Sequence, residues 1–383
     1  MRNLRDVELD GKRVLMRVDF NVPMDKQGNI LDDGKMRGAL PTIEYVLAHN
    51  GKLIIMSHLG RPKGKPDSKY SLKGLAPHLK NLLNGVVVNF AEDCVGPEVE
   101  EKVNSMKPGE VLLLENLRFH SGEEENDADF SRQLASLGDV YINDAFGSAH
   151  RAHSSTVGVA DYLPAFAGFL MESEVNMLKN VVESPQRPRM AILGGAKVAD
   201  KLGVIENLLE KMDIILIGGG MGNTFLKAQG KNVGKSLLEK DLLSEASRLL
   251  DKAEQKKVRL LLPVDVVIAG EISADAIATV VGVDEVPDDM MIVDIGPRTI
   301  EIYREEINQA KTIVWNGPMG VYEYEQFARG SQEITRAMAN AAAVSVIAGG
   351  DSAVIAHDLM LEDKITHIST GGGATLEFLE GIK

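Results

Sequence analysis

GFLMESEVNMLKNVVESPQRP, residues 168–188, divides the sequence into two halves of similar pattern. Apolar residues recur in it at helical spacing, at Met171, Val175, Leu178 and Val182. Such spacing indicates one apolar face of an α-helix. Pro185 and Pro188 follow at once, and proline cannot continue a helix. The stretch therefore predicts a linking helix over residues 168–183 and a domain boundary near residue 185.

Short runs rich in leucine or β-branched residues alternate with helix-like stretches on both sides of this segment. In the first half they are RVLMRV (13–18), KLIIM (52–56), EVLLLE (110–115) and DVYIN (139–143). In the second half they are RMAIL (189–193), DIILI (213–217), VRLLL (258–262), MIVDI (291–295), TIVW (312–315), VSVIA (344–348) and THIS (366–369). This alternation is typical of helices around a parallel sheet. We therefore expect an α/β fold with two Rossmann-like, doubly wound parallel-sheet domains, residues 1–167 and 184–373, joined by a hinge helix.

Composition narrows the class of protein. The 383 residues are 44% hydrophobic, enough for two cores of ordinary size. A formal net charge of −14 argues against a nucleic-acid or anionic-membrane partner. The charged start, MRNLRDVELDGKR, does not have the pattern of an export signal, and no apolar run approaches the roughly 18 residues of a membrane helix. The single cysteine, Cys94, cannot form an internal disulfide, so we expect a reducing cytoplasm. We also expect a monomer.

Polar residues that suit an anion follow the strands of the first half. They are Asp19 and Asn21 in VDFNVP, His58 and Arg61 in SHLGRP, Arg118 in ENLRFH, and His150, Arg151 and His153 in GSAHRAHSS. Open parallel sheets bind ligands just beyond the carboxyl ends of their strands. Because the planar guanidinium matches carboxylate and phosphate oxygens, the first domain is predicted to bind a small polyanion.

The strand ends of the second half are instead rich in glycine. The segments are GGAKVADK (194–201), GGGMGN (218–223), IGP (295–297), NGPMG (316–320), GGDS (349–352) and TGGG (370–373). Glycine lets a flat or phosphorylated ligand approach the backbone, which favours a nucleotide. Lys197 and Lys201, one helical turn apart, can face its phosphates, and the carboxylate of Asp351 can hold Mg²⁺.

An anion-binding domain joined by a helix to a nucleotide-binding domain is the layout of a bisubstrate phosphotransferase. Phosphoryl transfer needs positioning, Mg²⁺ and neutralisation of charge. No dinucleotide fingerprint G-x-G-x-x-G follows the first strand, which disfavours a nicotinamide dehydrogenase. Zinc-type ligand spacing is also missing, so the histidines are interpreted as polar site or turn residues. A two-domain solute-binding protein and a kinase acting on another phosphorylated acid remain alternatives.

Nine motifs resemble those of phosphoglycerate kinases, in the same order along the whole chain. They are RVDFNVP, SHLGRP, ENLRFH, DAFGSAHRAHSS, GGAKVADK, IGGGMGNTF, WNGPMGVYE, GGDSA and STGGGATLE. The resemblance implies reversible transfer of a phosphoryl group between 1,3-bisphosphoglycerate and ADP, giving 3-phosphoglycerate and MgATP. In the ATP-consuming direction the nucleophile is a carboxylate, ionised at pH 7, so no general base is needed.

The resemblance also implies roles for individual residues. Phosphoglycerate would be bound by Asp19, Asn21, Lys35, His58, Arg61, Arg118 and Arg151. The nucleotide would be bound by Gly195, Lys201, Gly219, Asn316, Pro318, Glu323, Gly349, Gly350, Asp351 and Ser352, with Glu323 on the ribose hydroxyls and Asp351 on Mg²⁺. The catalytic set would be Lys35, Lys197, Lys201, Gly371 and Gly372, with the backbone N–H groups of residues 371–373 facing the transferring group.

The sequence departs from the family pattern at Lys35. In DDGKMRGALPTI it stands where the family has an arginine, four residues before Ala39. A lysine keeps the charge but loses the bidentate fork. If the backbone here is extended, Arg37 would substitute for the family arginine, because residues i and i+2 then share a face. If instead a helix begins after Arg37, with Pro41 in its first turn, the conformation of the loop decides between Lys35 and Arg37. We expect Lys35 to hold the position and Arg37 to lie outside it.

The second departure is at the carboxyl end. The family usually continues past LEFLEG with a Leu-Pro-containing tail that returns to the first domain, whereas this chain ends at Lys383. Residues 374–383 are expected to pack onto the first domain. Because the longer tail is missing, closure of the two domains is expected to be less tightly coupled, unless the chain has been shortened. Closure is expected to bend at the ends of the helix over residues 168–183, because transfer requires contact between the ligands and exclusion of water.

Overall fold

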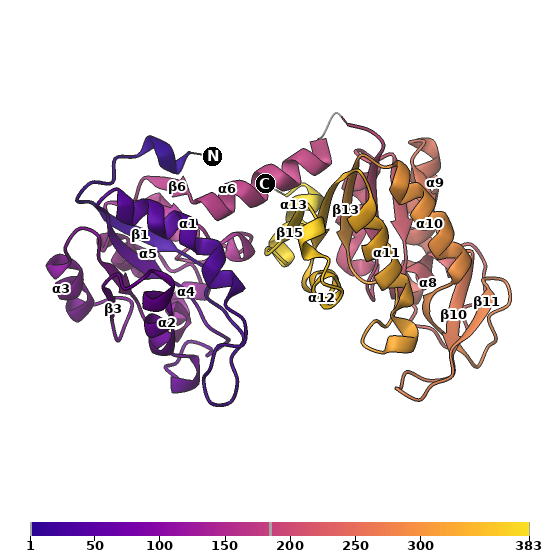
Figure 1. Ribbon diagram of the computed structural model, residues 1–383, viewed down its shortest axis with the longest axis horizontal. Coiled ribbons are helices and arrows are strands. Elements are labelled where there is room, and N and C mark those ends of the chain that lie inside the picture. The colour runs from indigo at the N-terminus through magenta and orange to yellow at the C-terminus, as the bar shows by residue number, and fades with distance from the viewer. Residues whose placement is uncertain (1, 184–185, 383) are drawn as a thin grey trace. The chain divides into compact units, whose positions relative to one another are not determined.

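The computed structural model describes residues 2–183 and 186–382, so Pro185 and the predicted boundary beside it lie outside the described residues. The chain forms two compact units, Met1–Val175 and Asn176–Lys383. Each contains a six-stranded parallel sheet with helices on both faces (Figure 1). The predicted α/β class with two parallel-sheet domains is therefore confirmed. Among the described residues, no helix is long and apolar enough to cross a membrane.

The sheet of the first unit has the order β3-β4-β2-β1-β5-β6. Its strands are β1 (Arg13–Arg17), β2 (Lys52–Met56), β3 (Val88–Phe90), β4 (Val111–Leu113), β5 (Val140–Asn143) and β6 (Ala165–Ala167). The accompanying helices are α1 (Gly34–Ala48), α2 (Leu75–Leu82), α3 (Pro97–Ser105), α4 (Ser121–Glu124) and α5 (Ala128–Ser136). Side chains alternate across a strand, so Val14 and Met16 of β1 join one hydrophobic core and Leu15 joins the other. One sheet thus separates two cores.

The parallel sheet of the second unit has the order β15-β14-β13-β7-β8-β9. Its strands are β7 (Arg189–Leu193), β8 (Ile214–Ile217), β9 (Arg259–Leu261), β13 (Thr312–Asn316), β14 (Val344–Ala348) and β15 (His367–Ser369). In chain order this is the 3-2-1-4-5-6 arrangement of doubly wound folds, with a switch point between β7 and β13. The helices are α7 (Leu202–Leu209), α8 (Gly219–Ala228), α9 (Leu243–Gln255), α10 (Pro297–Gln309), α11 (Arg329–Asn340), α12 (Gly350–Asp358) and α13 (Gly373–Glu380).

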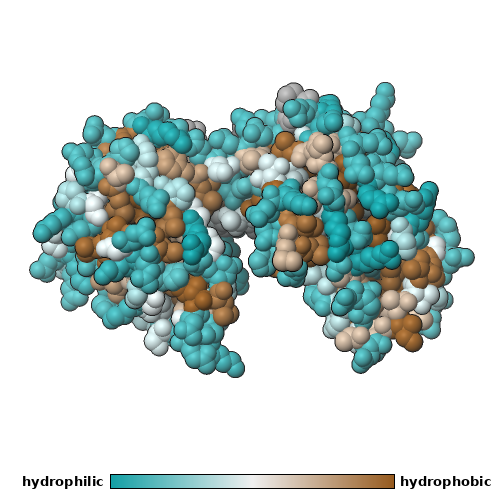
Figure 2. Space-filling model, in the orientation of Figure 1, coloured by the Kyte–Doolittle hydropathy of each residue, from teal (hydrophilic) through white to brown (hydrophobic). Residues whose placement is uncertain are grey.

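A second, antiparallel sheet in this unit was not predicted. It contains β10 (Asp265–Ala269), β11 (Thr279–Gly282) and β12 (Met291–Ile295) in the order β11-β10-β12. MIVDI is therefore a strand as predicted, but it pairs antiparallel with β10 outside the parallel sheet. Figure 2 shows apolar surface over this region, where Ile277 and Val280 are exposed.

The helix α6 (Phe169–Glu183) corresponds to the predicted linking helix. Its buried stripe contains Met171, Leu178 and Val182, three of the four apolar positions used to predict it. Asp144 Oδ1 accepts hydrogen bonds from the backbone N–H groups of Leu170 (2.9 Å) and Met171 (3.2 Å) at its start. These bonds satisfy donors that a helix N-terminus leaves unpaired, so β5 and its following loop fix where α6 begins.

The carboxyl-terminal helix α13 belongs to the second unit, where it packs against α7. Asn207 Nδ2 of α7 donates a 2.6 Å hydrogen bond to the carbonyl of Leu379, which is fully buried. These contacts lie within the second unit, and the packing of residues 374–383 onto the first domain stays a prediction. Because α13 is short and buries Ala374, Thr375 and Leu379, α7 already covers its apolar side. Lys383 lies outside the described residues.

Candidate active site

The predicted anion-binding residues of the first unit lie at the carboxyl end of its parallel sheet. β1 pairs with β2 on one side and with β5 on the other, so the order of the sheet reverses there. Asp19 and Asn21 follow β1, His58 and Arg61 follow β2, and Arg151 lies in the loop after β5. This switch point is where open α/β sheets bind their ligands.

Hydrogen bonds join several of these residues in one series. Lys35 Nζ lies 3.0 Å from Asp19 Oδ2, and Asp19 Oδ1 accepts from the backbone N–H of Asn21. Asn21 Oδ1 accepts from the N–H of Gly60 at 2.9 Å, and the carbonyl of Gly60 accepts from Arg118 Nη1 at 2.8 Å. Residues that are up to about a hundred positions apart in the sequence are thereby held in one place.

His58 is buried among positive charges. Burial lowers its pKa well below the usual range, and the positive charges of Arg17, Arg118, Lys35 and Arg151 lower it further. The imidazole is therefore neutral at pH 7. Arg17 Nη2 lies 3.1 Å from His58 Nδ1. Because a guanidinium only donates, Nδ1 is the acceptor and the ring proton is on Nε2.

Sequence reasoning missed the buried groups that hold this arrangement. Arg17 Nε donates to Ser155 Oγ at 2.8 Å, and Ser155 Oγ donates to Glu123 Oε1 at 2.5 Å. Burial raises the pKa of Glu123, which Arg17 and Ser155 oppose. The signal for Arg17 was a charged residue in the otherwise apolar run VLMRV (14–18), since such a residue needs a buried partner. Glu123 and Ser155 had no comparable signal.

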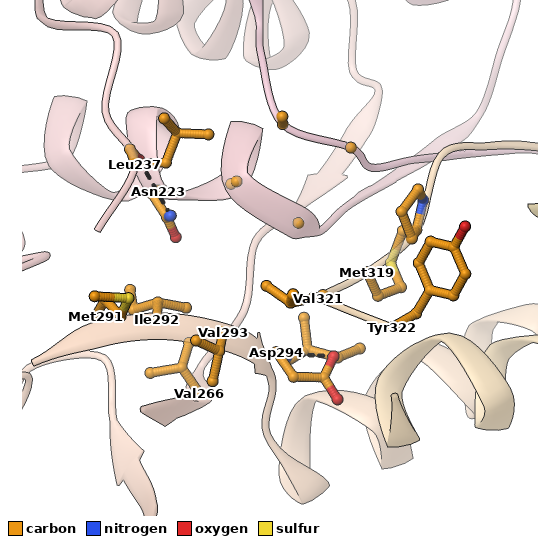
Figure 3. Close-up of a pocket in the computed structure, with 18 of the residues that line it drawn as sticks. Asn223, Leu237, Val266, Met291, Ile292, Val293, Asp294, Met319, Val321 and Tyr322 are labelled. Atoms are coloured by element: carbon orange, nitrogen blue, oxygen red, sulfur yellow. Dashed lines mark hydrogen bonds between the residues drawn. The ribbon is translucent and has the colours of Figure 1, made fainter. Parts of the chain in front are cut away.

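In the second unit, a cavity of about 260 Å³ lies beside the glycine-rich strand ends (Figure 3). It is bordered by the start of α8, by β12 and by the loop from Pro318 to Glu323. Of the predicted nucleotide-binding residues, five line it: Gly195, Gly219, Pro318, Glu323 and Asp351. Apolar side chains also line the cavity and form a wall that suits a flat ring: Leu226, Leu237, Val266 and Val293.

The remaining predicted residues lie next to this cavity. Asn316 Nδ2 donates to the carbonyl of Ala348 at 2.7 Å, and Ser352 Oγ accepts from the N–H of Gly317 at 2.9 Å. These bonds tie the ends of β13 and β14 together, beside Gly349 and Gly350 at the start of α12. Tyr322 donates its hydroxyl proton to Asp351 at 3.2 Å.

Some of these glycines are required by the protein itself as well as by a ligand. Gly219 has a φ of +66°, and a Cβ there would lie 2.7 Å from the carbonyl oxygens of Gly195 and Pro318. The loops after β7, β8 and β13 therefore touch through their backbones. The glycine pattern predicted an open crevice, and close contact between these loops is an additional reason for it.

The two predicted lysines lie in different settings. Lys201 is buried, and its Nζ donates to the carbonyl of Gly194 at 2.5 Å. Burial lowers its pKa to about 8, against the effect of Asp200 and Asp351. Lys197 is exposed in the loop before the short 3-10 helix Ala199–Lys201. The expectation that the two lie one turn apart on a helix is therefore wrong, because helical backbone begins only after Lys197.

The triple glycine forms a turn from strand to helix. β15 ends at Ser369 and α13 begins at Gly373. Gly372 has a φ of +50°, a conformation in which an L side chain is strained. Gly371 is held by its N–H, which donates to Ser369 Oγ at 3.2 Å. The helix N-terminus thus follows a fixed turn and presents backbone donors.

A family model for phosphoglycerate kinase matches residues 4–382. The chain belongs to the phosphoglycerate kinase family. It is 56% identical to a phosphoglycerate kinase of Moorella thermoacetica, over 99% of this chain and 96% of that protein. A solved phosphoglycerate kinase from Coxiella burnetii is 43% identical, with a TM-score of 0.90 and coverage of 99% and 96%. One from Pyrococcus horikoshii is 35% identical, with a TM-score of 0.84 and coverage of 100% and 96%.

Membership in the phosphoglycerate kinase family makes the protein a phosphotransferase with a carboxyl group as acceptor, a glycolytic kinase that uses a nucleotide and small-molecule substrates. Lys35, which differs from the pattern of this family, lies on α1, which begins at Gly34. Arg37 lies two positions further on the same helix and pairs with Asp33 at 2.7 Å. Both backbone arrangements considered for Arg37, an extended segment and a helix beginning after it, are wrong, because α1 already includes Arg37. Positions i and i+2 of a helix face different directions, so Arg37 does not point the same way as Lys35.

Proposed function

We propose that the protein transfers a phosphoryl group reversibly, with Mg²⁺, between 1,3-bisphosphoglycerate and ADP. The observation that carries the proposal is the concentration of cationic side chains around neutral His58 at the switch point of the first sheet. In a protein with a net charge of −14, such a cluster favours a small ligand with several negative charges. The glycine-lined cavity of the second unit supports a nucleotide as the other substrate.

The first unit is proposed to bind phosphoglycerate. Arg118, Arg61 and Arg151 supply guanidinium donors, and Arg118 is oriented by its bond to Gly60. His58 donates through Nε2, the nitrogen opposite the one that Arg17 contacts. Asp19 accepts from the hydroxyl group of the substrate and Asn21 donates to its oxygen through Nδ2, while Asp19 also holds Lys35 and Asn21 Oδ1 holds the loop at Gly60. The cations thus neutralise the phosphate while the polar groups set its orientation.

The second unit is proposed to bind ADP or ATP, with the ring against the apolar wall and the ribose at Glu323. Lys201 and the backbone N–H groups of the GGDS segment face the phosphates. Asp351 fits a magnesium ion, because its carboxylate lines the cavity and Mg²⁺ usually takes one or two protein carboxylates besides phosphate oxygens. The ion would neutralise charge on the phosphates.

Transfer is proposed to be direct and in line. The attacking carboxylate needs no base, so the protein supplies position and positive charge. Lys197 is exposed and therefore able to reach the transferring group, joined by Lys35 and by the N–H groups of residues 371–373. Backbone donors fixed before the reaction stabilise the developing charge without reorganising.

Domain closure is proposed to bend at the ends of α6. Its start is bonded to Asp144, and near its end Arg189 Nη1 donates to the carbonyl of Val182 at 2.9 Å. Each end is therefore fixed to a different unit, and the residues beside it are placed to absorb the rotation. Small-angle scattering should show compaction with both substrates bound, and an unchanged radius of gyration would contradict this.

We further propose that the enzyme is a cytoplasmic monomer.

The activity is tested by mixing the protein with Mg²⁺, ATP and 3-phosphoglycerate and following ³¹P NMR. ADP and an acyl phosphate should appear together, and leaving out Mg²⁺ should stop the reaction. Nucleotide binding without turnover would contradict the proposal. Other phosphorylated acids would then be compared as competitors, because the same cationic cluster would accept them.

A further inference from the structure

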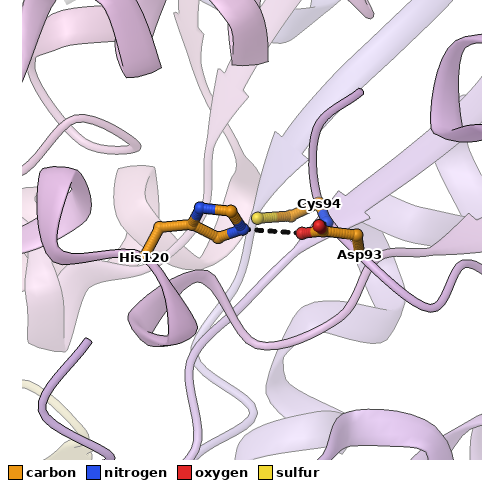
Figure 4. A group of neighbouring side chains, drawn as sticks. All are labelled: Asp93, Cys94 and His120. Carbon is orange, nitrogen blue, oxygen red and sulfur yellow. Dashed lines mark hydrogen bonds and ion pairs between the residues drawn. The ribbon is translucent and has the colours of Figure 1, made fainter. Parts of the chain in front are cut away.

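Three side chains with different metal-binding atoms meet in the first unit, outside the groups assigned above. Asp93 and Cys94 follow β3, and His120 follows the short 3-10 helix Leu117–Phe119 after β4. β3 and β4 are parallel neighbours, so their carboxyl ends lie at one edge of the sheet. The His120 nitrogen, the Cys94 sulfur and an Asp93 oxygen all lie within 4.8 Å of one another (Figure 4).

We propose that Asp93, Cys94 and His120 form a binding site for Zn²⁺. Imidazole, thiolate and carboxylate are the ligands that zinc takes in proteins, and three protein ligands plus a water complete a tetrahedron. Metal–ligand distances of about 2.0–2.3 Å place neighbouring ligand atoms about 3.3–3.6 Å apart. The His120 Nε2 to Asp93 Oδ1 distance is 2.7 Å, so these two side chains need to separate by less than an ångström.

The surroundings favour a cation at this place. The cavity beside the cluster, about 500 Å³, is lined by His120 and by four carboxylates, those of Asp67, Glu92, Asp93 and Glu115. It gives a metal ion access from solvent and leaves space for the water ligand. The thiol of Cys94 is completely buried, whereas His120 and Asp93 are partly exposed. The site therefore has one fixed ligand at its base and two side chains that can adjust.

Zinc binding replaces a proton. Burial raises the pKa of Cys94 well above its usual value, and the negative charges of Asp93 and Glu123 add to this, so the free protein holds a thiol. When zinc binds, the S–H bond of Cys94 breaks, its proton goes to solvent and the Zn–S bond forms. The Nε2–H bond that His120 directs at Asp93 also breaks, and the ring proton moves through solvent to Nδ1, so that Nε2 can bind the metal. The nearby carboxylates that oppose a bare thiolate attract the metal ion.

The test uses the untagged full chain, freed of metal by a chelator and without nucleotide. Zn²⁺ is measured by equilibrium dialysis, and Co²⁺ serves as a coloured substitute. One zinc per chain should bind, and Co²⁺ should give intense tetrahedral absorption with a thiolate-to-metal charge-transfer band. Excess Mg²⁺ should not displace either ion, because magnesium prefers oxygen ligands in an octahedron.

Variants identify the ligands. His120→Asn should weaken zinc binding at least tenfold, and Cys94→Ser should remove the charge-transfer band. His78→Asn is the matched control, because the side chains of His78 and His120 are both 34% exposed and each bonds an aspartate through Nε2. It should bind zinc as the unaltered protein does. Should Cys94→Ser not fold, His120→Asn still decides. A cobalt spectrum without the thiolate band, or undiminished zinc binding by His120→Asn, would overturn the proposal.

Discussion

The two candidate ligand sites use opposite means to hold an anion. In the first unit the proposed ligand would face charged side chains, of which Lys35 is held by Asp19 and Arg118 by the carbonyl of Gly60. In the second unit it faces glycine backbone, with Lys201 as a buried cation beside it. A side-chain site depends on single charges, whereas a backbone site depends on the path of the chain. The two should therefore respond differently to substitution and to pH.

The largest expected effect is on the side-chain site. Arg118→Ala should raise the dissociation constant of 3-phosphoglycerate about ten- to a hundredfold, because hydrogen bonds to charged groups contribute about 1.5–3 kcal/mol. Binding of ADP should be unchanged, since Arg118 lies in the other unit. Isothermal titration of each ligand separately measures both constants.

The matched control for Arg118→Ala is Arg132→Ala. Arg132 lies on α5 of the same unit and pairs with Asp129 on the surface. Exposed ion pairs of this kind contribute little, so this variant should bind both ligands normally. Equal loss of affinity in both variants would show that the effect is not specific to the proposed site.

The next effect is on the pH dependence of nucleotide binding. Lys201 has a pKa lowered to about 8, so it is mostly charged at pH 7 and mostly neutral at pH 9. If ADP requires the charged form, its affinity should fall about tenfold from pH 7 to pH 9. Fluorescence of Trp315, whose indole N–H donates to the carbonyl of Gly317 at 2.7 Å, gives the measurement.

Two variants separate Lys201 from other groups that titrate in this range. Lys201→Met should bind ADP weakly with a flat pH profile, because no charge remains to be lost. Lys197→Met should keep the slope, since Lys197 is exposed and is assigned to the transferring group. A slope that persists in Lys201→Met would assign the pH dependence to another group.

A smaller effect, with the opposite sign, is expected at Lys35. Lys35→Arg restores a planar fork to a site that now has a single-point donor, so the transfer rate should rise about two- to tenfold. Arg37→Lys is the control, because Arg37 pairs with Asp33 and should leave the rate unchanged. Steady-state rates at saturating substrates make the comparison. No gain with Lys35→Arg would mean that Lys35 does not hold the arginine position.

Sequence pattern predicted ten of the twelve described strands of the two parallel sheets and failed for the antiparallel sheet. All eleven predicted runs are strands, because long buried strands leave continuous apolar runs. Four of the described strands were not predicted: β3 and β6, which have three residues each, β10, and β11, which is largely exposed. Register and partner also have no local signal, which is why β12 was not assigned to an antiparallel sheet.

For the sites, the sequence named candidate ligand-binding residues, which stay predictions, and missed the buried groups that hold some of them in place. Arg61 and Arg118 follow strands and stand out in an acidic chain. Glu123 and Ser155 reach Arg17 only through tertiary packing. The cluster of Asp93, Cys94 and His120 has no zinc-type spacing, because its members come from two strand ends that meet only in the folded sheet.

The smallest effect is predicted at the backbone site, in Gly372→Ala. An added Cβ would meet no atom within 4 Å, so only backbone strain acts, about 1–3 kcal/mol, because a φ of +50° with a ψ of −113° strains an L residue. If the turn aims N–H groups at the transferring phosphoryl group, kcat should fall about two- to fivefold while both dissociation constants stay the same. Gly11→Ala is the matched control, since Gly11 has a φ of +68° and equal space around it but lies before β1. Both variants should lose thermal stability, and only Gly372→Ala should lose turnover. Equal kcat values in the two would show that the turn after β15 serves the fold alone.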